Sequence, residues 1–369
     1  MKDLLRRGLE GLVPYEPGRP ISVVEKELGI EEAIKLASNE SPYKPFPTVI
    51  EAMQRAVLDV NRYPDGGCTF LREKLADKHG VSPSMIMVGS GSNELLRLLA
   101  NVLLNPEDEA VMANPSFIVY PTVVKLMNAT PVEVPLKDYR HGLQSMAGAV
   151  TERTKIVFIC NPNNPTGTIV TRDEVEAFMA KIPQDVVVVM DEAYYELVRD
   201  RDYPDGIDYI NGERPVVVFR TFSKVYGLAG CRIGYGIAPE FLVQAVNKVR
   251  EPFNVGTVAQ VGAFVSLDCT AEVEERSLLN DEGLRYFYEE FTRLGLDYVP
   301  SHANFVLLDV GTDGRAISNE LMKKGVIVRS GDIFGYPQHI RVSVGTPEEN
   351  ARFTGELENV LGKKGHQHD

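Results

Sequence analysis

The sequence has few cysteines, and no two of them stand at short spacing. Its four cysteines are Cys68, Cys160, Cys231 and Cys269, and none forms a Cys-x-x-Cys motif. Because that motif is typical of zinc and redox sites, we expect neither kind of site. The six histidines are isolated or lie in the C-terminal tail, so we expect no metal. Scattered thiols suit a reducing compartment, which favours a cytoplasmic protein.

The sequence also lacks an excess of positive charge and any long apolar run. Its formal net charge is -13, which argues against nucleic acid or an anionic membrane as the main partner. No apolar run approaches the about eighteen residues that a membrane-spanning helix needs. Charges interrupt the apolar residues of MKDLLRRGLEGLVPYEPG, so we expect no signal peptide. Hydrophobic residues make up 44% and charged residues 25%, which is typical of a globular protein.

Residues 46–265 alternate helical patterns with short apolar strands, which is typical of an α/β domain with a mainly parallel sheet. Strands are expected at residues 109–113, 155–160, 185–190, 215–220 and 232–237. Helices are expected at residues 46–60, 92–104, 171–182 and 239–250. The runs KIVFIC and DVVVVM are apolar at nearly every position, as expected for strands covered on both faces.

The pattern changes after about residue 270. A long charged helix is expected at residues 271–294, followed by strands at 304–310, 325–330 and 339–345. This order predicts a second, smaller α+β domain that the N-terminal segment joins. We therefore predict a large domain of residues 42–262 and a small domain of residues 1–41 and 263–369. The polar tail, GKKGHQHD, is expected to be frayed.

Three polar motifs directly follow predicted strands. NPNNPTG (161–167) follows KIVFIC, DEAYYE (191–196) follows VVVVM, and TFSK (221–224) follows VVVFR. Ligands collect at the carboxyl ends of the strands of parallel α/β sheets, so the three motifs should converge on one cleft. Each motif alone has a plainer reading as a turn or a helix start, but that reading leaves their shared position unexplained.

Lys224 stands among apolar neighbours in TFSKVYGLAG. Burial there would lower the pKa of its amine, because a dry environment disfavours the charged form. A neutral amine attacks carbonyls, so the residue suggests a Schiff base with an aldehyde cofactor or substrate. The plain alternative is a lysine whose stem lies along apolar surface while its amine reaches water.

Pyridoxal phosphate is an aldehyde cofactor whose needs match the three motifs. Its ring nitrogen requires an acid, and Asp191 stands where an apolar strand ends. Tyr194 and Asn164 can reach the phenolic oxygen of the ring, and Phe117 can cover a ring face. Phe117 by itself would otherwise be read as a core residue.

A glycine-rich turn, VGSGSNELL, opens a predicted helix and suits the cofactor phosphate. Its donors would come from the helix start at Gly91, Ser92 and Asn93. Further donors would come from Thr221, Ser223 and Arg232, after the strand expected at residues 215–220. The turn lacks the third glycine of a dinucleotide site and the Gly-Lys-Ser/Thr of a P-loop.

Arg341 lies in HIRVSVG, whose alternation places His339, Arg341 and Ser343 on one face of a strand. An arginine fork on this polar face can bind a substrate carboxylate through two parallel hydrogen bonds. The alternative is an arginine that pairs on the surface.

With these residues assembled, the chain resembles the fold type I pyridoxal-phosphate aminotransferases, and within them the histidinol-phosphate aminotransferase family. The resemblance covers nearly the whole chain and implies a seven-stranded, mainly parallel sheet between helices. Lys224 matches the family's Schiff-base lysine, and Asp191 matches the partner of the ring nitrogen. The other matches are Tyr194 and Asn164 for the ring oxygen, Arg232 for the phosphate, Phe117 where the family usually has a stacking tyrosine, and Arg341 for the α-carboxylate.

Three further stretches carry the resemblance to that narrower family. They are LVPYEPGRPI (12–21), IKLASNESPY (34–43) and NRYPDGG (61–67). The resemblance implies that Tyr63 reaches the cofactor phosphate of the partner subunit, and therefore that the protein is a homodimer. It also implies that Tyr15 and Asn39 lie near the substrate.

The expected reaction converts histidinol phosphate and 2-oxoglutarate into imidazole acetol phosphate and glutamate, in histidine biosynthesis. Two alternatives keep the same fold and cofactor: an aminotransferase for aromatic or other amino acids, and a threonine-phosphate decarboxylase. A third alternative is a non-catalytic module that only binds the cofactor. That module would be expected to lose Lys224 or Asp191, and both are present.

Overall fold

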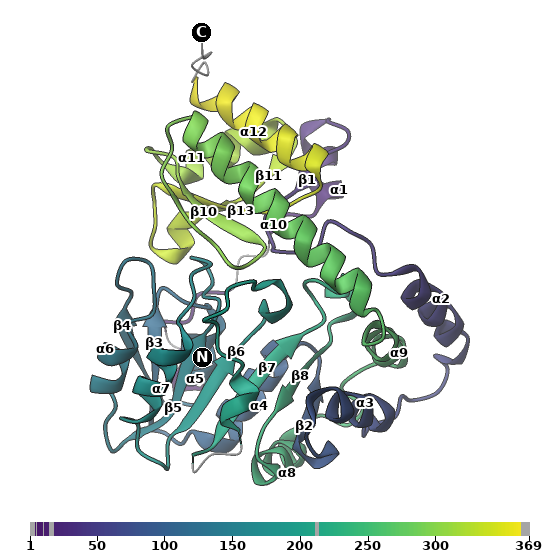
Figure 1. Cartoon of the computed structure of the whole chain (residues 1–369), viewed down its shortest axis with the longest axis vertical. Helices are drawn as coiled ribbons and strands as arrows, with labels where there is room; N and C mark the ends of the chain where they lie inside the picture. The colour runs from purple at the N-terminus through teal and green to yellow at the C-terminus, as the bar shows by residue number, and fades with distance from the viewer. Residues whose placement is uncertain (1–3, 5, 10, 15–17, 211–213, 363–369) are drawn as a thin grey trace.

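The computed structural model describes residues 4, 6–9, 11–14, 18–210 and 214–362, and a seven-stranded sheet forms its larger part (Figure 1). The strand order is β2-β8-β7-β6-β5-β3-β4. The strands are β2 (Ile86–Gly89), β3 (Glu109–Asn114), β4 (Thr130–Pro135), β5 (Thr154–Cys160), β6 (Val187–Asp191), β7 (Val216–Thr221) and β8 (Gly234–Ile237). β8 is antiparallel to both of its neighbours, and the other neighbouring pairs are parallel. The predicted mainly parallel sheet is confirmed.

Apolar cores cover both faces of this sheet. In β5, Val157 and Ile159 belong to one core, whereas Ile156 and Phe158 belong to the other. The helices around the sheet are α2 (Pro47–Ala56), α3 (Thr69–His79), α4 (Ser92–Leu103), α5 (Val119–Leu126), α6 (Leu143–Gly148), α7 (Arg172–Met179), α8 (Glu240–Val249) and α9 (Thr257–Ser266). Burial on both faces explains why the inner strands are apolar throughout their length.

Local signals explain where several of these elements begin and end. α7 begins at a capping box in which Thr171 and Glu174 satisfy each other's backbone N–H groups. The helix predicted at residues 46–60 leaves the α-helical form after Ala56 and continues as the 3₁₀ helix η3 (Val57–Asp59). The strand predicted at residues 232–237 begins two residues late, because Arg232 has a left-handed φ of 52°.

A second, smaller sheet lies above the first in Figure 1 and is wholly antiparallel. Its order is β12-β13-β10-β9, with β9 (Tyr298–Val299), β10 (Phe305–Asp309), β12 (Arg329–Ser330) and β13 (His339–Ser343). Three helices accompany it: α10 (Thr270–Arg293), α11 (Gly314–Lys323) and α12 (Pro347–Leu361). The part of the chain after about residue 270 therefore has the α+β character that its sequence predicts.

The N-terminal part of the chain meets this smaller unit. After α1 (Ile21–Leu28), β1 (Ile34–Lys35) pairs in parallel with β11 (Val326–Ile327). The single strand predicted at residues 325–330 was wrong in this respect: its first half, β11, pairs with β1, and its second half, β12, pairs with β13. Because the strand is interrupted after Ile327, residues 326–330 pair with strands of two different sheets.

The division into domains stays a proposal. The predicted boundary after residue 262 falls inside α9, which packs against α2 and α3. We therefore propose that the large domain extends to the end of α9, and that α10 begins the C-terminal part of the small domain. In Figure 1, α10 runs from beside α9 to the level of α12.

Candidate active site

A cavity of about 400 Å³ lies where β5, β6 and β7 end, between the larger sheet and the smaller one. This volume falls within the about 300–1,000 Å³ of small-molecule sites. Of the predicted site residues that the structure describes, all except Tyr63 line it, namely Asn39, Gly91, Ser92, Asn93, Phe117, Asn164, Asp191, Tyr194, Thr221, Ser223, Lys224, Arg232 and Arg341. The three strand-end motifs therefore do converge.

Lys224 lies in a bend after β7 and extends toward the smaller unit. Its Nζ donates a 3.0 Å hydrogen bond to the backbone oxygen of Asn39. Burial, together with the nearby Arg341 guanidinium, lowers the pKa of Lys224 to about 8. A substantial fraction of the amine is therefore neutral at mildly basic pH, as a nucleophile requires.

Asp191 is the last residue of β6, and only 2% of it is exposed. Its Oδ2 accepts a 2.8 Å hydrogen bond from the hydroxyl of Tyr120, whereas its buried Oδ1 has no hydrogen-bond partner among the described residues. Burial raises the pKa of Asp191 to about 6, although the Tyr120 hydrogen bond opposes the rise. A buried carboxylate oxygen without a partner, in the wall of a cavity, suits a cationic N–H donor.

Tyr194 lies beside Asn39, and the two residues connect both parts of the chain. The Nδ2 of Asn39 donates a 3.0 Å hydrogen bond to the Tyr194 hydroxyl, and the Oγ of Ser343 donates to the Oδ1 of Asn39. Asn39 is 2% exposed, so this network is shielded from water. It fixes the Tyr194 hydroxyl at the wall of the cavity.

An anion cradle forms where α4 begins. Gly91 adopts a left-handed φ of 76°, and the first turn of α4 follows it. A Cβ on Gly91 would lie 2.7 Å from the Nη2 of Arg232, so the arginine occupies the space that a side chain would need. Free N–H groups at the helix start, the guanidinium and the Thr221 hydroxyl together suit a phosphate.

Arg341 projects from β13 into the same cavity. It donates a 2.6 Å hydrogen bond to the Oδ1 of Asn164 and a 3.0 Å hydrogen bond to the oxygen of Ala37. Arg329 of β12 is its direct partner in register and also lines the cavity. Two guanidinium groups on adjacent strands make this wall suited to an anionic substrate.

Two residues that line or support the cavity, Tyr120 and Arg329, were not predicted from the sequence. Tyr120, which holds Asp191, is a polar side chain within the apolar helix α5 and is fully buried. Arg329 stands in VIVRS, and its distance from Arg341 in sequence hides their pairing. A buried tyrosine in an apolar helix was the available signal for the first, since such a hydroxyl needs a partner. Nothing in the sequence alone placed the second.

Phe117 and Tyr63, both predicted to contact the cofactor, differ in where they lie. The ring of Phe117 lines the cavity and meets Tyr120 edge-on, with 5.6 Å between centroids. Tyr63 lies outside the cavity, is 83% exposed, and stacks on Phe253 with 4.7 Å between ring centroids. Tyr15 lies outside the described residues.

Residues 31–357 match the family model described as aminotransferase class I and II. The chain belongs to this aminotransferase family. It is 51% identical over 359 residues to Histidinol-phosphate aminotransferase 2 of Carboxydothermus hydrogenoformans, covering 97% of this chain and 99% of that protein. It is 45% identical to Histidinol-phosphate aminotransferase of Caldicellulosiruptor saccharolyticus, covering 97% of this chain and 100% of that protein.

A solved structure agrees with the aminotransferase fold. The histidinol-phosphate aminotransferase from Sinorhizobium meliloti, in complex with pyridoxal-5'-phosphate, has a TM-score of 0.90 and 28% identity, with 97% of each chain covered. The predicted fold type I architecture is therefore confirmed. Among the described residues, no three histidine, cysteine or acidic side chains come together as metal ligands. No described helix is long and apolar enough to cross a membrane.

Proposed function

We propose that this aminotransferase transfers the amino group of histidinol phosphate to 2-oxoglutarate, giving imidazole acetol phosphate and glutamate, in histidine biosynthesis. The observation that carries the proposal is one cavity that combines a lysine of lowered pKa, a buried acid and three arginines. The names of relatives that are 51% and 45% identical over nearly the whole chain support the same substrate.

The cofactor is pyridoxal phosphate, and the residues present fit it. The unpartnered Oδ1 of Asp191 suits the protonated ring nitrogen, and the cradle of Gly91 and Arg232 suits the phosphate. Phe117 would cover a ring face, while Tyr194 and Asn164 would meet the ring oxygen. When bound, this cofactor supplies an electron-accepting ring for the negative charge that develops at the substrate carbon.

Lys224 would hold the cofactor covalently at rest. Once the substrate amine has displaced it, its free Nζ would carry a proton away from the substrate carbon and return one, as general base and acid. The lowered pKa of Lys224 suits both roles, because the amine can be neutral or protonated near the working pH. Asp191 would keep the proton on the ring nitrogen through its ionised carboxylate.

The paired arginines would bind the anionic end of each substrate. A guanidinium fork donates hydrogen bonds to carboxylate and phosphate oxygens alike, so Arg341 and Arg329 suit both histidinol phosphate and glutamate. We propose that Arg341 takes the glutamate α-carboxylate by exchanging its hydrogen bond to Asn164. Asn39 and Tyr15 would lie near the substrate, as the family resemblance implies.

A single-turnover experiment tests the reaction. Cofactor-loaded protein is mixed with histidinol phosphate, without 2-oxoglutarate, and the visible absorption band is followed. We expect the band to disappear and to return when 2-oxoglutarate is added, with glutamate formed. No change with histidinol phosphate, but a change with another amino donor, would give the chain a different substrate. Carbon dioxide release from phosphothreonine would make it a decarboxylase.

We further propose a homodimer, in which Tyr63 of each subunit meets the cofactor phosphate of the other. An exposed apolar patch around Tyr63 supports this proposal. It consists of Val57, Leu58, Val60, Tyr63 and Phe70, each more than half exposed in the single chain. We also propose a cytoplasmic location, because the four cysteines are free and a reducing compartment keeps them so.

A further inference from the structure

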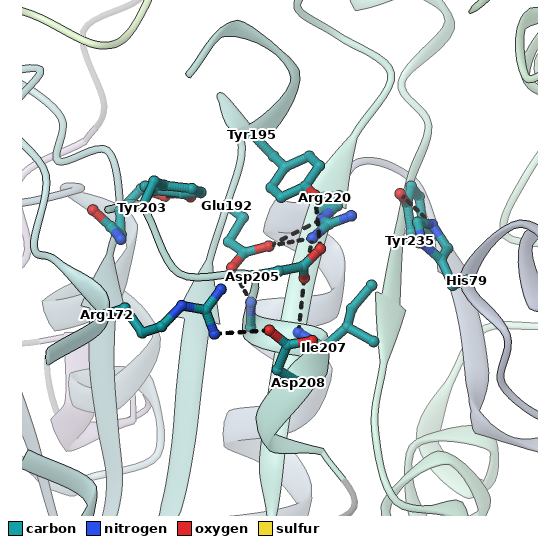
Figure 2. A network of polar contacts seen from close by, with 12 residues as sticks. His79, Arg172, Glu192, Tyr195, Tyr203, Asp205, Ile207, Asp208, Arg220 and Tyr235 are labelled. Carbon is teal, nitrogen blue, oxygen red and sulfur yellow. Dashed lines mark hydrogen bonds and ion pairs between the residues drawn. The ribbon is translucent and has the colours of Figure 1, made fainter. Parts of the chain in front are cut away.

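A network of charged and polar side chains surrounds Arg220 (Figure 2). Arg220 of β7 is 2% exposed, and its Nε and Nη2 donate to the Oε2 of Glu192 at 2.9 and 2.7 Å. The same Nη2 donates to the Oδ1 of Asp205 at 2.7 Å. The ring of Tyr195 lies over the guanidinium, with 3.3 Å from its centroid to Cζ. Arg220 is thus bonded to two carboxylates and covered by an aromatic ring.

The two carboxylates are themselves held by the backbone. The second oxygen of Glu192, Oε1, accepts a 2.7 Å hydrogen bond from the N–H of Gly206. Asp205 accepts bonds from the Tyr195 hydroxyl at 2.7 Å and from the N–H of Ile207 at 2.9 Å. Gly206 and Ile207 begin the 3₁₀ helix η6 (Gly206–Tyr209), which leads into β7. The network therefore connects the end of β6 to the loop before β7 and to β7 itself.

Adjacent residues divide between this network and the active site. Glu192 follows Asp191, and Arg220 precedes Thr221; in each pair one side chain is in the network and its neighbour lines the cavity. Tyr195 likewise follows Tyr194. For Arg220 and Thr221, which both belong to β7, the division follows from strand geometry, in which successive side chains point to opposite faces. Because each network residue is joined by one peptide bond to a cavity residue, a displacement of Arg220 would move Thr221. A displacement of Glu192 would likewise move Asp191.

We propose that this network positions the reacting groups, and that Arg220 and Glu192 are positioning residues for the transamination. It holds the ends of β6 and β7 in a fixed relation, so that Asp191 and Lys224 face each other across the cavity. The inference rests on the proposed function for its kinetic effect. Its effect on Lys224 in the unloaded protein is independent of any substrate.

The chemistry of the network favours a positioning role over simple stabilisation. A guanidinium fixes directions because its donors are planar and rigid, whereas a lysine amine binds as a point charge. A buried ion pair often contributes little net stability compared with apolar residues of the same shape. If the network only stabilised the fold, apolar side chains of the same shape could replace it without loss. If it fixes the positions of the strand ends, such a replacement would lower activity.

The first test compares Arg220→Lys and Glu192→Gln with wild type at a temperature where each is fully folded by circular dichroism. We expect kcat for histidinol phosphate to fall about 10- to 100-fold, because small misplacements of reacting groups slow reactions by such factors. KM should change less than about threefold, since neither residue contacts the substrate. Glu192→Gln keeps the shape of the side chain, so it carries the test if Arg220→Lys does not fold.

The second readout needs no cofactor or substrate. The pH dependence of Lys224 acetylation in the unloaded protein, followed by peptide mass spectrometry, reports the pKa of its amine. Loosened strand ends would admit water, so we expect the midpoint to rise by about one pH unit in Arg220→Lys. If wild type fails to transaminate histidinol phosphate, the proposed function falls, while this readout still decides for or against the network.

Glu109→Gln is the matched control. Glu109 is also buried, at 4% exposure, and pairs with Arg153, but it lies at the start of β3, the opposite end of the sheet from the cavity. We expect this variant to keep wild-type kcat and the wild-type Lys224 midpoint. Equal losses in Glu109→Gln and Glu192→Gln would show a general effect of broken ion pairs and would overturn the proposal.

The double variant Arg220→Met, Glu192→Met separates stability from position. We expect its melting temperature to recover in part relative to the single variants, because the buried Arg220–Glu192 pair is removed as a whole. Asp205 loses its Arg220 contact but is partly exposed and keeps its hydrogen bonds from Tyr195 and Ile207. We expect its kcat to stay low and its Lys224 midpoint to stay high. Recovery of kcat together with stability would contradict a positioning role, as would a folded Arg220→Lys protein with wild-type kcat and midpoint.

Discussion

Asp191 and Lys224 line the same cavity, and burial moves their pKa values in opposite directions. The pKa of Asp191 rises to about 6, and that of Lys224 falls to about 8. In both residues the dry environment disfavours the charged form. At mildly basic pH the two shifts leave Asp191 ionised and a fraction of Lys224 neutral, which are the forms that their proposed roles need.

We predict that removing the Arg341 charge raises the pKa of Lys224. The guanidinium of Arg341 lowers that pKa after burial does, so Arg341→Met should move the midpoint of Lys224 acetylation above about 8. The measurement is the acetylation rate of the unloaded protein against pH. Arg329→Met serves as the control, because Arg329 is not among the main causes of the shift. An unchanged midpoint in Arg341→Met would count against this account.

We predict that Asp191→Asn stabilises the unloaded protein while it slows transamination. Because the pKa of Asp191 is raised from 3.8 to about 6 in the folded protein, its ionisation destabilises the fold increasingly as the pH rises from 3.8, and the loss is complete above about pH 6. The variant should gain about 2–3 kcal/mol at pH 7.5 and nothing at acidic pH. Transamination should fall about 10²- to 10⁴-fold. Denaturant unfolding and steady-state rates check both results, and equal stability at pH 7.5 would refute the first.

At the scale of elements, the start of α4 combines three features that serve one purpose. The turn before it has a left-handed glycine, its first N–H groups have no intrahelical partners, and Arg232 fills the space beside Gly91. Arg232 itself adopts a left-handed φ, which ends the turn before β8 and directs the side chain toward Gly91. The sequence indicated the glycine-rich turn, but the close approach of the arginine is a tertiary contact.

We predict that Gly91→Ala weakens cofactor binding by about tenfold, because its Cβ would displace the Arg232 guanidinium. Gly80→Ala is the matched control: Gly80 also has a positive φ, of 65°, but no atom lies within 4 Å of its added Cβ. Gly80→Ala should lose about 1–2 kcal/mol of stability from its left-handed backbone. Gly91→Ala should lose more, because its ψ of 165° places it in a region that only glycine adopts readily, so the comparison is made between cofactor affinities of the folded proteins. Fluorescence titration of the unloaded proteins with pyridoxal phosphate measures the difference. Equal affinities would mean that Gly91 is not part of the cradle.

The sequence predicted the elements with strong local signals and missed the weaker ones. α7, α8 and the strands β5, β6 and β7 have clear periodicity or continuous apolar runs. β4 was missed because it is an edge strand with proline near each end and only one buried residue. β2 was missed because four residues are too few for a pattern. The split into β11 and β12 depends on partners that the local sequence does not name.

At the scale of the whole molecule, α10 joins the two sheets and reaches the site through Arg276. The Nη1 of Arg276 donates a 2.8 Å hydrogen bond to the oxygen of Val225, the residue after Lys224. Its guanidinium also lies over the ring of Phe46, at 3.9 Å from the centroid. The helix that connects the two parts of the chain is therefore attached next to Lys224.

We predict that Phe70→Glu dissociates the proposed homodimer. Phe70 belongs to the exposed apolar patch around Tyr63, and a buried charge at a subunit interface is unfavourable. The mass from light scattering should halve, and cofactor affinity should fall with it, because Tyr63 would no longer reach the other subunit's site as proposed. Phe241→Glu is the control: Phe241 is 60% exposed but lies on α8, outside the patch. A dimer that survives Phe70→Glu would place the interface elsewhere.

The sequence by itself determined the fold class, the strand ends that carry the site, and the identity of most residues in the cavity. It could do so because continuous apolar strands and turn motifs are local signals, and parallel strands bring their carboxyl ends together. Only the tertiary structure decided that Tyr120 holds Asp191, that Arg329 stands beside Arg341, and that Arg220 ties two strands from behind. These contacts join residues from different elements, and their energies depend on burial that no single segment contains.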